Sequence, residues 1–167
     1  MQVYADHAAT TALCPAACEA MLQCMREVYG NPSSLHTPGQ QAARELTAAR
    51  ETIAACLGAQ AREITFTSGG SEADNQALLS AAALGARAGK RHIVSTRFEH
   101  HAVLHMLDKL ARQGFSVTLL DVPSSGVIEA EQVRQALRPD SCLVSVMFAN
   151  NEIGTIEPIA QIGALCR

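Results

Sequence analysis

The stretch Thr67-Ser68-Gly69-Gly70-Ser71-Glu72 lies where a predicted strand meets a predicted helix. Residues 62–67 (REITFT) carry the β-branched and aromatic side chains that favour a strand, and residues 71–89 form an alanine-rich helical segment. Glycines let the backbone approach a ligand, and the first N–H groups of a helix have no partner inside it. With the helix dipole and the Ser71 hydroxyl, the turn is suited to bind a phosphate group. Alone, a Gly-Gly sequence before a helix is more often an ordinary tight turn.

The rest of the chain alternates between predicted strands and helices. The strands are predicted at 92–96, 115–120 and 142–148, and the helices at 99–113, 130–137 and from about residue 158. Strands that are apolar throughout and separated by helices predict an α/β fold, mainly a parallel sheet with helices on both faces. A ligand is then expected at the carboxyl ends of the strands.

Two further helices are predicted before residue 62. One opens at Cys14-Pro15 and runs to about Tyr29, and the other has Thr37 as its N-cap and ends at Gly58.

Composition excludes several functional classes. The chain has 167 residues, a net charge of −3 and 48% hydrophobic residues, and it shows no basic stripe. We therefore expect neither a nucleic-acid partner nor a membrane partner. The N-terminus has no secretory signal pattern, and the six cysteines include no CxxC pair. Free, buried thiols in the reducing cytoplasm are the expectation for such cysteines.

Three polar clusters follow three predicted strands. They are the Gly-Gly turn, residues 96–101 (TRFEHH) and residues 149–154 (ANNEIG). Because the carboxyl ends of parallel strands share one edge of a sheet, these clusters are expected to surround one ligand.

Five ordered motifs then indicate a family: DHAATT at 6–11, GNPSSLH at 30–36, FTSGGSEADN at 66–75, EHHAV at 99–103 and NNEIG at 150–154. Together they closely resemble the N-terminal half of cysteine desulfurases of the nitrogen-fixation and iron–sulfur-cluster type. The resemblance implies a partial large domain of the aspartate-aminotransferase fold (fold type I), with pyridoxal 5'-phosphate as cofactor. Residues 1–61 would form an N-terminal arm and helices, and residues 62–167 the first part of the cofactor-binding large domain.

The resemblance also assigns roles by position. Gly70 and Ser71 would hold the cofactor phosphate; the family often has Ala-Thr or Gly-Thr there, so Gly-Ser departs from the pattern but keeps a hydroxyl. His100 would stack on the pyridine ring and move protons, which suits a flat imidazole that titrates near neutrality. Asn151 would approach the phenolic oxygen of the cofactor and the substrate. Without the family match, Asn151 could equally hold a turn through its side chain.

The residues that would complete the chemistry are expected after Arg167. Pyridoxal chemistry needs a lysine amine, and neither Lys90 nor Lys109 has the family's context for it. The aspartate at the pyridine nitrogen and the nucleophilic cysteine are also expected downstream, since neither Asp121 nor any of the six cysteines matches. We therefore expect an N-terminal fragment that does not turn over cysteine alone.

The family reaction converts L-cysteine to L-alanine and passes sulfur to an enzyme persulfide. It implies a homodimer, built partly by residues 8–11 and 30–36, and a sulfur-acceptor or scaffold protein for iron–sulfur cluster or thio-cofactor assembly. The alternatives are a selenocysteine lyase or another fold-type-I enzyme, and a non-catalytic remnant or dimerisation module. A metal site at His101 and His105 beside Asp108 is less favoured, because these side chains are expected to face water.

Overall fold

The computed structural model describes residues 3–167, which divide into two compact units. The first unit ends at Phe66, and the second runs from Thr67 to Arg167. No helix in the described part of the chain is both long enough and apolar enough to cross a membrane.

The first unit contains the helices α1 (Pro15–Glu27) and α2 (Thr37–Leu57) and the short 3-10 helix η1 (Ala61–Glu63). The N-cap of α2 was predicted at Thr37, and this prediction is wrong by one residue. His36 is the cap, because its Nδ1 atom accepts a hydrogen bond from the Gly39 N–H at 3.3 Å. The predicted end at Gly58 is confirmed: with φ at 64°, this residue adopts the left-handed conformation that favours glycine.

The strand predicted at 62–67 is not formed. The Glu63 carboxylate accepts a hydrogen bond from the Gln60 N–H at 2.8 Å, which closes the turn of η1 at the start of the segment. Ile64 then has extended dihedral angles, but no described strand pairs with it. Local preference makes a segment extended, whereas a strand also needs a neighbour to receive its backbone hydrogen bonds.

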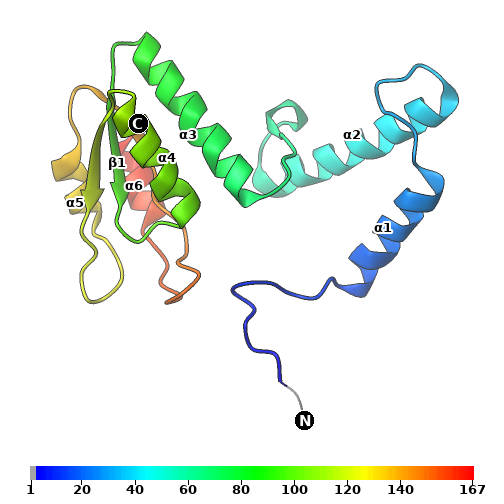
Figure 1. Cartoon of the computed structure of the whole chain (residues 1–167), viewed down its shortest axis with the longest axis horizontal. Coiled ribbons are helices and arrows are strands. Elements are labelled where there is room, and N and C mark those ends of the chain that lie inside the picture. The colour runs from blue at the N-terminus through cyan, green and yellow to red at the C-terminus, as the bar shows by residue number, and fades with distance from the viewer. Residues whose placement is uncertain (1–2) are drawn as a thin grey trace. The chain divides into compact units, whose positions relative to one another are not determined.

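The second unit (green to red in Figure 1) is built on a three-stranded parallel sheet in the order β2-β1-β3. The strands are β1 (His92–Thr96), β2 (Ser116–Leu120) and β3 (Ser141–Val144). The parallel sheet is therefore confirmed, although β3 ends four residues earlier than predicted. All five residues of β1 are buried, including the polar His92, Ser95 and Thr96, because both faces of a parallel sheet are covered.

Helices cover both faces of this sheet, as predicted. On one face, α3 (Gly70–Arg87) and α4 (His101–Arg112) pack around Ile93. On the other face, α5 (Ala130–Ala136) and α6 (Ile159–Leu165) pack around Val94. Because neighbouring residues of a strand point to opposite faces, β1 supplies both halves of the core.

Candidate functional site at the carboxyl ends of the strands

The N-terminus of α3 is open to a ligand. Its N-cap is Gly69, which has no side chain to accept from the first N–H groups, and a side chain at Gly70 would meet nothing within 4 Å. No described residue accepts a hydrogen bond from the Gly70 or Ser71 N–H. The acidic residue of this turn, Glu72, accepts from the Ser68 N–H and hydroxyl, both at 2.6 Å, and these bonds lower the pKa of its carboxyl.

His100 follows β1 and is the N-cap of α4. Its Nδ1 atom accepts a hydrogen bond from the Ala102 N–H at 3.1 Å. Since that nitrogen is an acceptor, the neutral imidazole carries its proton on Nε2. The helix cap thus fixes both the ring and the tautomer of His100.

Asn150 holds the loop that carries Asn151. The Oδ1 atom of Asn150 accepts from the Glu152 and Ile153 N–H groups at 2.9 and 3.0 Å. Its Nδ2 atom donates to the Phe98 carbonyl at 3.2 Å, which ties this loop to the segment after β1. Asn150 is buried, whereas Asn151 is exposed. Sequence analysis did not predict that Asn150 holds this loop. The signal that could have shown it is an asparagine at the first position of a turn, because its side chain often accepts hydrogen bonds from the backbone two or three residues later.

Glu99 makes a second connection between the same two segments. Its buried carboxylate accepts from the Met147 N–H at 2.7 Å and from the Thr96 hydroxyl at 3.2 Å. Burial raises the pKa of Glu99, and these two hydrogen bonds oppose the shift. Glu99 and Asn150 together place the loop after β3 beside His100.

Two cavities meet at His100. A groove of about 520 Å³ between α3 and α4 is lined by Ser71 and His100, among others. A cavity of about 270 Å³ is lined by His100 and Asn151. The structure therefore brings His100 next to each of the other predicted side chains, while Ser71 and Asn151 line different cavities.

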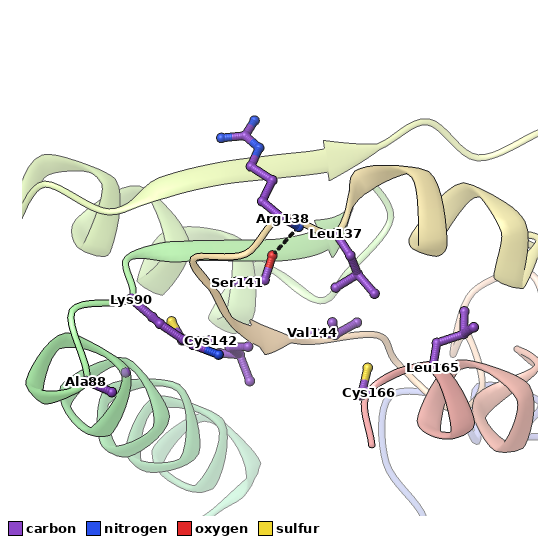
Figure 2. A pocket seen from close by; sticks show the side chains of 11 residues that line it. Ala88, Lys90, Leu137, Arg138, Ser141, Cys142, Val144, Leu165 and Cys166 are labelled. Carbon is purple, nitrogen blue, oxygen red and sulfur yellow. Dashed lines mark hydrogen bonds between the residues drawn. The ribbon is translucent and has the colours of Figure 1, made fainter.

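A third cavity, of about 450 Å³, lies at the opposite ends of the strands (Figure 2). Lys90 and Cys142 line one end of it and Cys166 the other, and Lys90 stands two residues before β1. Lys90 is therefore at the amino ends of the strands, as predicted, and far along the sheet from His100. Burial raises the pKa of the Cys142 thiol, which disfavours its thiolate form.

The other cysteines correct one expectation. Buried thiols were predicted, but Cys14, Cys18, Cys24, Cys56 and Cys166 are exposed. Four of these lie in the first unit, where apolar side chains such as Met25 and Leu57 are exposed as well. Apolar neighbours in sequence predict the burial of a cysteine only where a second helix or a strand packs over its helix.

His101, His105 and Asp108 are exposed on α4, as expected from the buried stripe of Val103 and Leu107. No cluster of three or more metal-ligating side chains exists among residues 3–167.

Comparison with known proteins identifies the family. The model for "Aminotransferase class-V" matches residues 3–167. The chain belongs to the class-V aminotransferase family. Members of this family generally bind pyridoxal phosphate.

The relatives of the chain are named cysteine desulfurases. It is 46% identical over 166 residues to "Putative cysteine desulfurase IscS 1" of Bacillus subtilis and 48% identical over 166 residues to "Cysteine desulfurase IscS" of Clostridium botulinum. These matches cover 99% of the chain but 44% and 42% of the relatives. The chain thus spans less than half the length of the relatives it matches.

Solved structures confirm the fold. A "NIFS-LIKE PROTEIN" superposes with a TM-score of 0.94 at 39% identity, covering 99% of this chain and 45% of that one. "SspA in complex with cysteine" gives a TM-score of 0.89 at 37% identity, covering 98% and 47%. The α/β architecture is therefore that of the NifS and IscS proteins.

The residues present fit the family's cofactor. An oxyanion would find two N–H donors at Gly70 and Ser71, a hydroxyl on Ser71 and no side chain in its way. A flat ring would find the imidazole of His100 on the wall of the adjoining cavities. Asn151 lies beyond it with an amide that no described side chain engages.

Proposed function

We propose that this chain forms part of a pyridoxal-phosphate-dependent cysteine desulfurase, which converts L-cysteine to L-alanine and transfers sulfur to an enzyme persulfide. The observation that carries the proposal is the position of His100. It lies at the carboxyl end of β1, between the open N-terminus of α3 and the loop of Asn151. The names of the relatives support the same activity.

Each residue has a defined task in this proposal. The Gly70 and Ser71 N–H groups and the Ser71 hydroxyl bind the phosphate, because the helix end supplies partial positive charge and unpaired donors. Asn151 donates a hydrogen bond to the phenolic oxygen. His100 orients the ring by stacking and moves a proton at Nε2, the nitrogen that its helix cap leaves available. Pyridoxal phosphate, when bound, supplies the electron sink for chemistry at the substrate α-carbon.

The proposal assigns the remaining chemistry to residues outside this chain. Lys109 lies on the exposed face of α4, and Lys90 lies at the amino ends of the strands. Neither amine is at the carboxyl ends, where a covalent bond to the cofactor has to form. Residues 1–61 would serve as arm and helices, and residues 62–167 as the first part of the cofactor-binding domain of a cytoplasmic homodimer. The sulfur would pass to an acceptor or scaffold protein for iron–sulfur cluster or thio-cofactor assembly.

The test is the formation of alanine from L-cysteine with added cofactor, together with the release of sulfide when an added thiol reductant reduces the enzyme persulfide. The protein as its own cell makes it should be active, and the 167-residue chain alone should be inactive. Turnover by the 167-residue chain would refute the assignment of the lysine and the cysteine to other residues. Activity with selenocysteine but not with cysteine would mean that the protein is a selenocysteine lyase and not a cysteine desulfurase.

A pair of variants isolates the imidazole of His100. His100→Asn keeps a good N-cap acceptor for the Ala102 N–H, so α4 should stay intact while the proton-transfer group is lost. In the active protein, kcat should then fall by roughly 10²- to 10⁴-fold. Gln113→Ala, at the far end of the same helix, is the control and should keep full activity. An unchanged kcat in His100→Asn would remove His100 from the mechanism.

A further inference from the structure

Residues 148–157 form a short hairpin that carries Asn151 in its turn. At the base of the hairpin, the Glu157 N–H donates a hydrogen bond to the Phe148 carbonyl at 2.9 Å, and an antiparallel bridge joins the two arms one residue further on. Glu157 is therefore the last residue of the second arm, and α6 begins two residues later. A side chain at this position can fix the direction in which the hairpin leaves the sheet.

The Glu157 side chain ties the hairpin to the loop after β2. Glu157 is 3% exposed, and its Oε2 atom accepts a hydrogen bond from the Ile128 N–H at 2.9 Å. Ile128 is itself buried in the same apolar cluster as Val94. In the described part of the chain, this is the only hydrogen bond between the hairpin and residues 121–129. Glu157 thus anchors the hairpin to the core of the second unit.

The hairpin and this loop are closely packed beside that hydrogen bond. A Cβ atom at Gly126 would lie 2.8 Å from Thr155 Cγ2 and 2.9 Å from Ile153 Cδ1. The hairpin therefore rests directly on the loop after β2. Glu157 adds the directional contact, because a hydrogen bond has a preferred geometry that apolar packing lacks.

A second buried carboxylate holds the first arm of the hairpin. Glu99 accepts a hydrogen bond from the Met147 N–H, one residue before the hairpin begins. Burial raises the pKa of Glu99, and the charges of Asp74 and Glu157 add to this rise, so Glu99 and Glu157 lie near one another. The base of the hairpin is thus held on one side by the segment after β1 and on the other side by the loop after β2.

We propose that Glu157 is a positioning residue for Asn151. Glu157 fixes the base of the hairpin, and the hairpin holds Asn151 at the cavity that this residue shares with His100. The effect on a ligand is indirect, because Glu157 is buried and does not line that cavity. The inference rests on the contact of Asn151 with the cofactor in the proposed function, but the hold of Glu157 on the hairpin is measurable without a ligand.

Amide hydrogen exchange in the ligand-free chain tests the first step. Glu157→Leu fills a similar space but cannot accept from the Ile128 N–H. The Asn150 and Gly154 amides, which donate within the hairpin, should then exchange about fivefold faster, the factor that one ordinary hydrogen bond represents. Glu157→Gln keeps the acceptor and should exchange like the wild type. The control Ile93→Val causes a similar loss of stability on the other face of the sheet and should leave both amides unchanged.

A titration with pyridoxamine 5'-phosphate tests the second step. NMR of the ¹⁵N-labelled chain gives the affinity of the wild type, Asn151→Ala, Glu157→Leu and the double variant Asn151→Ala/Glu157→Leu. Each single change should weaken binding by about fivefold, and the double variant should bind no more weakly than Asn151→Ala alone. Losses that do not add mean that Glu157 acts through Asn151. Ile93→Val should bind like the wild type.

Two results would overturn the proposal. Unchanged exchange at Asn150 and Gly154 in Glu157→Leu would mean that Glu157 does not hold the hairpin. Additive losses of affinity would mean that Glu157 does not act through Asn151. If Asn151→Ala itself binds like the wild type, the proposed function loses its contact at Asn151, and the exchange rates alone decide whether Glu157 positions that residue.

Discussion

Replacing His92 by phenylalanine tests how the sheet is held together. His92 is fully buried at the start of β1, and its ring joins the two neighbouring strands. The Nδ1 atom lies 2.7 Å from the Ser141 hydroxyl of β3, and the Nε2 atom lies 2.9 Å from the Thr118 hydroxyl of β2. Ser141 accepts from the Arg138 N–H, so its own hydroxyl proton is available to Nδ1.

The expected loss of stability follows from these two hydrogen bonds. Phenylalanine keeps most of the ring volume, so the loss comes from the two hydrogen bonds, while Arg138 still donates to both hydroxyl groups. A hydrogen bond between neutral groups contributes about 1 kcal/mol, which gives a total of about 2 kcal/mol for His92→Phe. Larger values are not expected, because Thr118 and Ser141 are half-buried and water can reach them in part.

The same variant should change how stability depends on pH. Burial, and to a lesser extent the nearby Arg138 guanidinium, lowers the pKa of His92 from its ordinary value of 6.5, while Asp140 opposes the shift. Below about pH 6.5 the unfolded chain therefore binds a proton that the folded chain excludes. The contribution of neutral His92 is fully present above this pH and is lost as the pH falls. The difference in stability between the two proteins should thus narrow between pH 7.5 and pH 5.5.

Urea unfolding followed by far-ultraviolet circular dichroism is the suitable assay, because the chain has no tryptophan and both tyrosines precede residue 30. At an m-value of about 2 kcal/mol/M, the midpoint should fall by about 1 M. His105→Phe changes an exposed histidine and is the control. A midpoint equal to wild type, or a difference that does not change with pH, would refute the role of His92.

Two further substitutions test the packing and the buried acid. A methyl group at Gly85 would overlap the Cβ atom of Cys142, so Gly85→Ala should cost roughly 1–3 kcal/mol in thermal or urea unfolding, and unchanged stability would disprove close contact between α3 and β3. Glu99→Gln keeps the acceptor for the Met147 N–H but removes a buried charge. Because the pKa of Glu99 is raised, its stabilising contribution is present below the unfolded value of about 4.5 and is lost as the pH rises through the folded one. The melting temperature of Glu99→Gln, relative to that of the wild type, should therefore rise between pH 4 and pH 7. A difference in melting temperature that stays constant over this range would contradict this.

The sequence predicted those parts of the fold that depend on burial from both sides. β1 has the predicted bounds, and β2 starts one residue later than predicted. Both strands lack charged aspartate, glutamate, lysine and arginine side chains, as expected where helices cover both faces of a sheet. The strand prediction for residues 62–67 is wrong, because a strand needs a second strand to pair with and local composition does not show whether one is available. The cap of α2 moved to His36 because an imidazole nitrogen can accept the N–H that a threonine hydroxyl usually accepts.

The sequence indicated where the candidate site lies, but it did not indicate the hydrogen bonds of Asn150 and Glu99 that hold the site together. Strand ends located His100 and Asn151, because parallel strands bring their carboxyl ends to one edge. Ser71 was predicted from the turn before α3, and the strand expected ahead of that turn is not formed. Asn150 and Asn151 are identical in sequence, and only the fold separates the buried residue from the exposed one. The connection from Glu99 to Met147 spans 48 positions of sequence, so no local pattern could indicate it.

The central claim is that Gly70, Ser71 and His100 bind the cofactor without a lysine of this chain. The most direct measurement is an NMR titration of the ¹⁵N-labelled chain with pyridoxamine 5'-phosphate, whose amine cannot form a Schiff base with a lysine. The account predicts shifts at the Gly70 and Ser71 amides and at the His100 ring, which Ser71→Ala weakens. Shifts around Lys90 and Cys142, or no shifts at all, would contradict it.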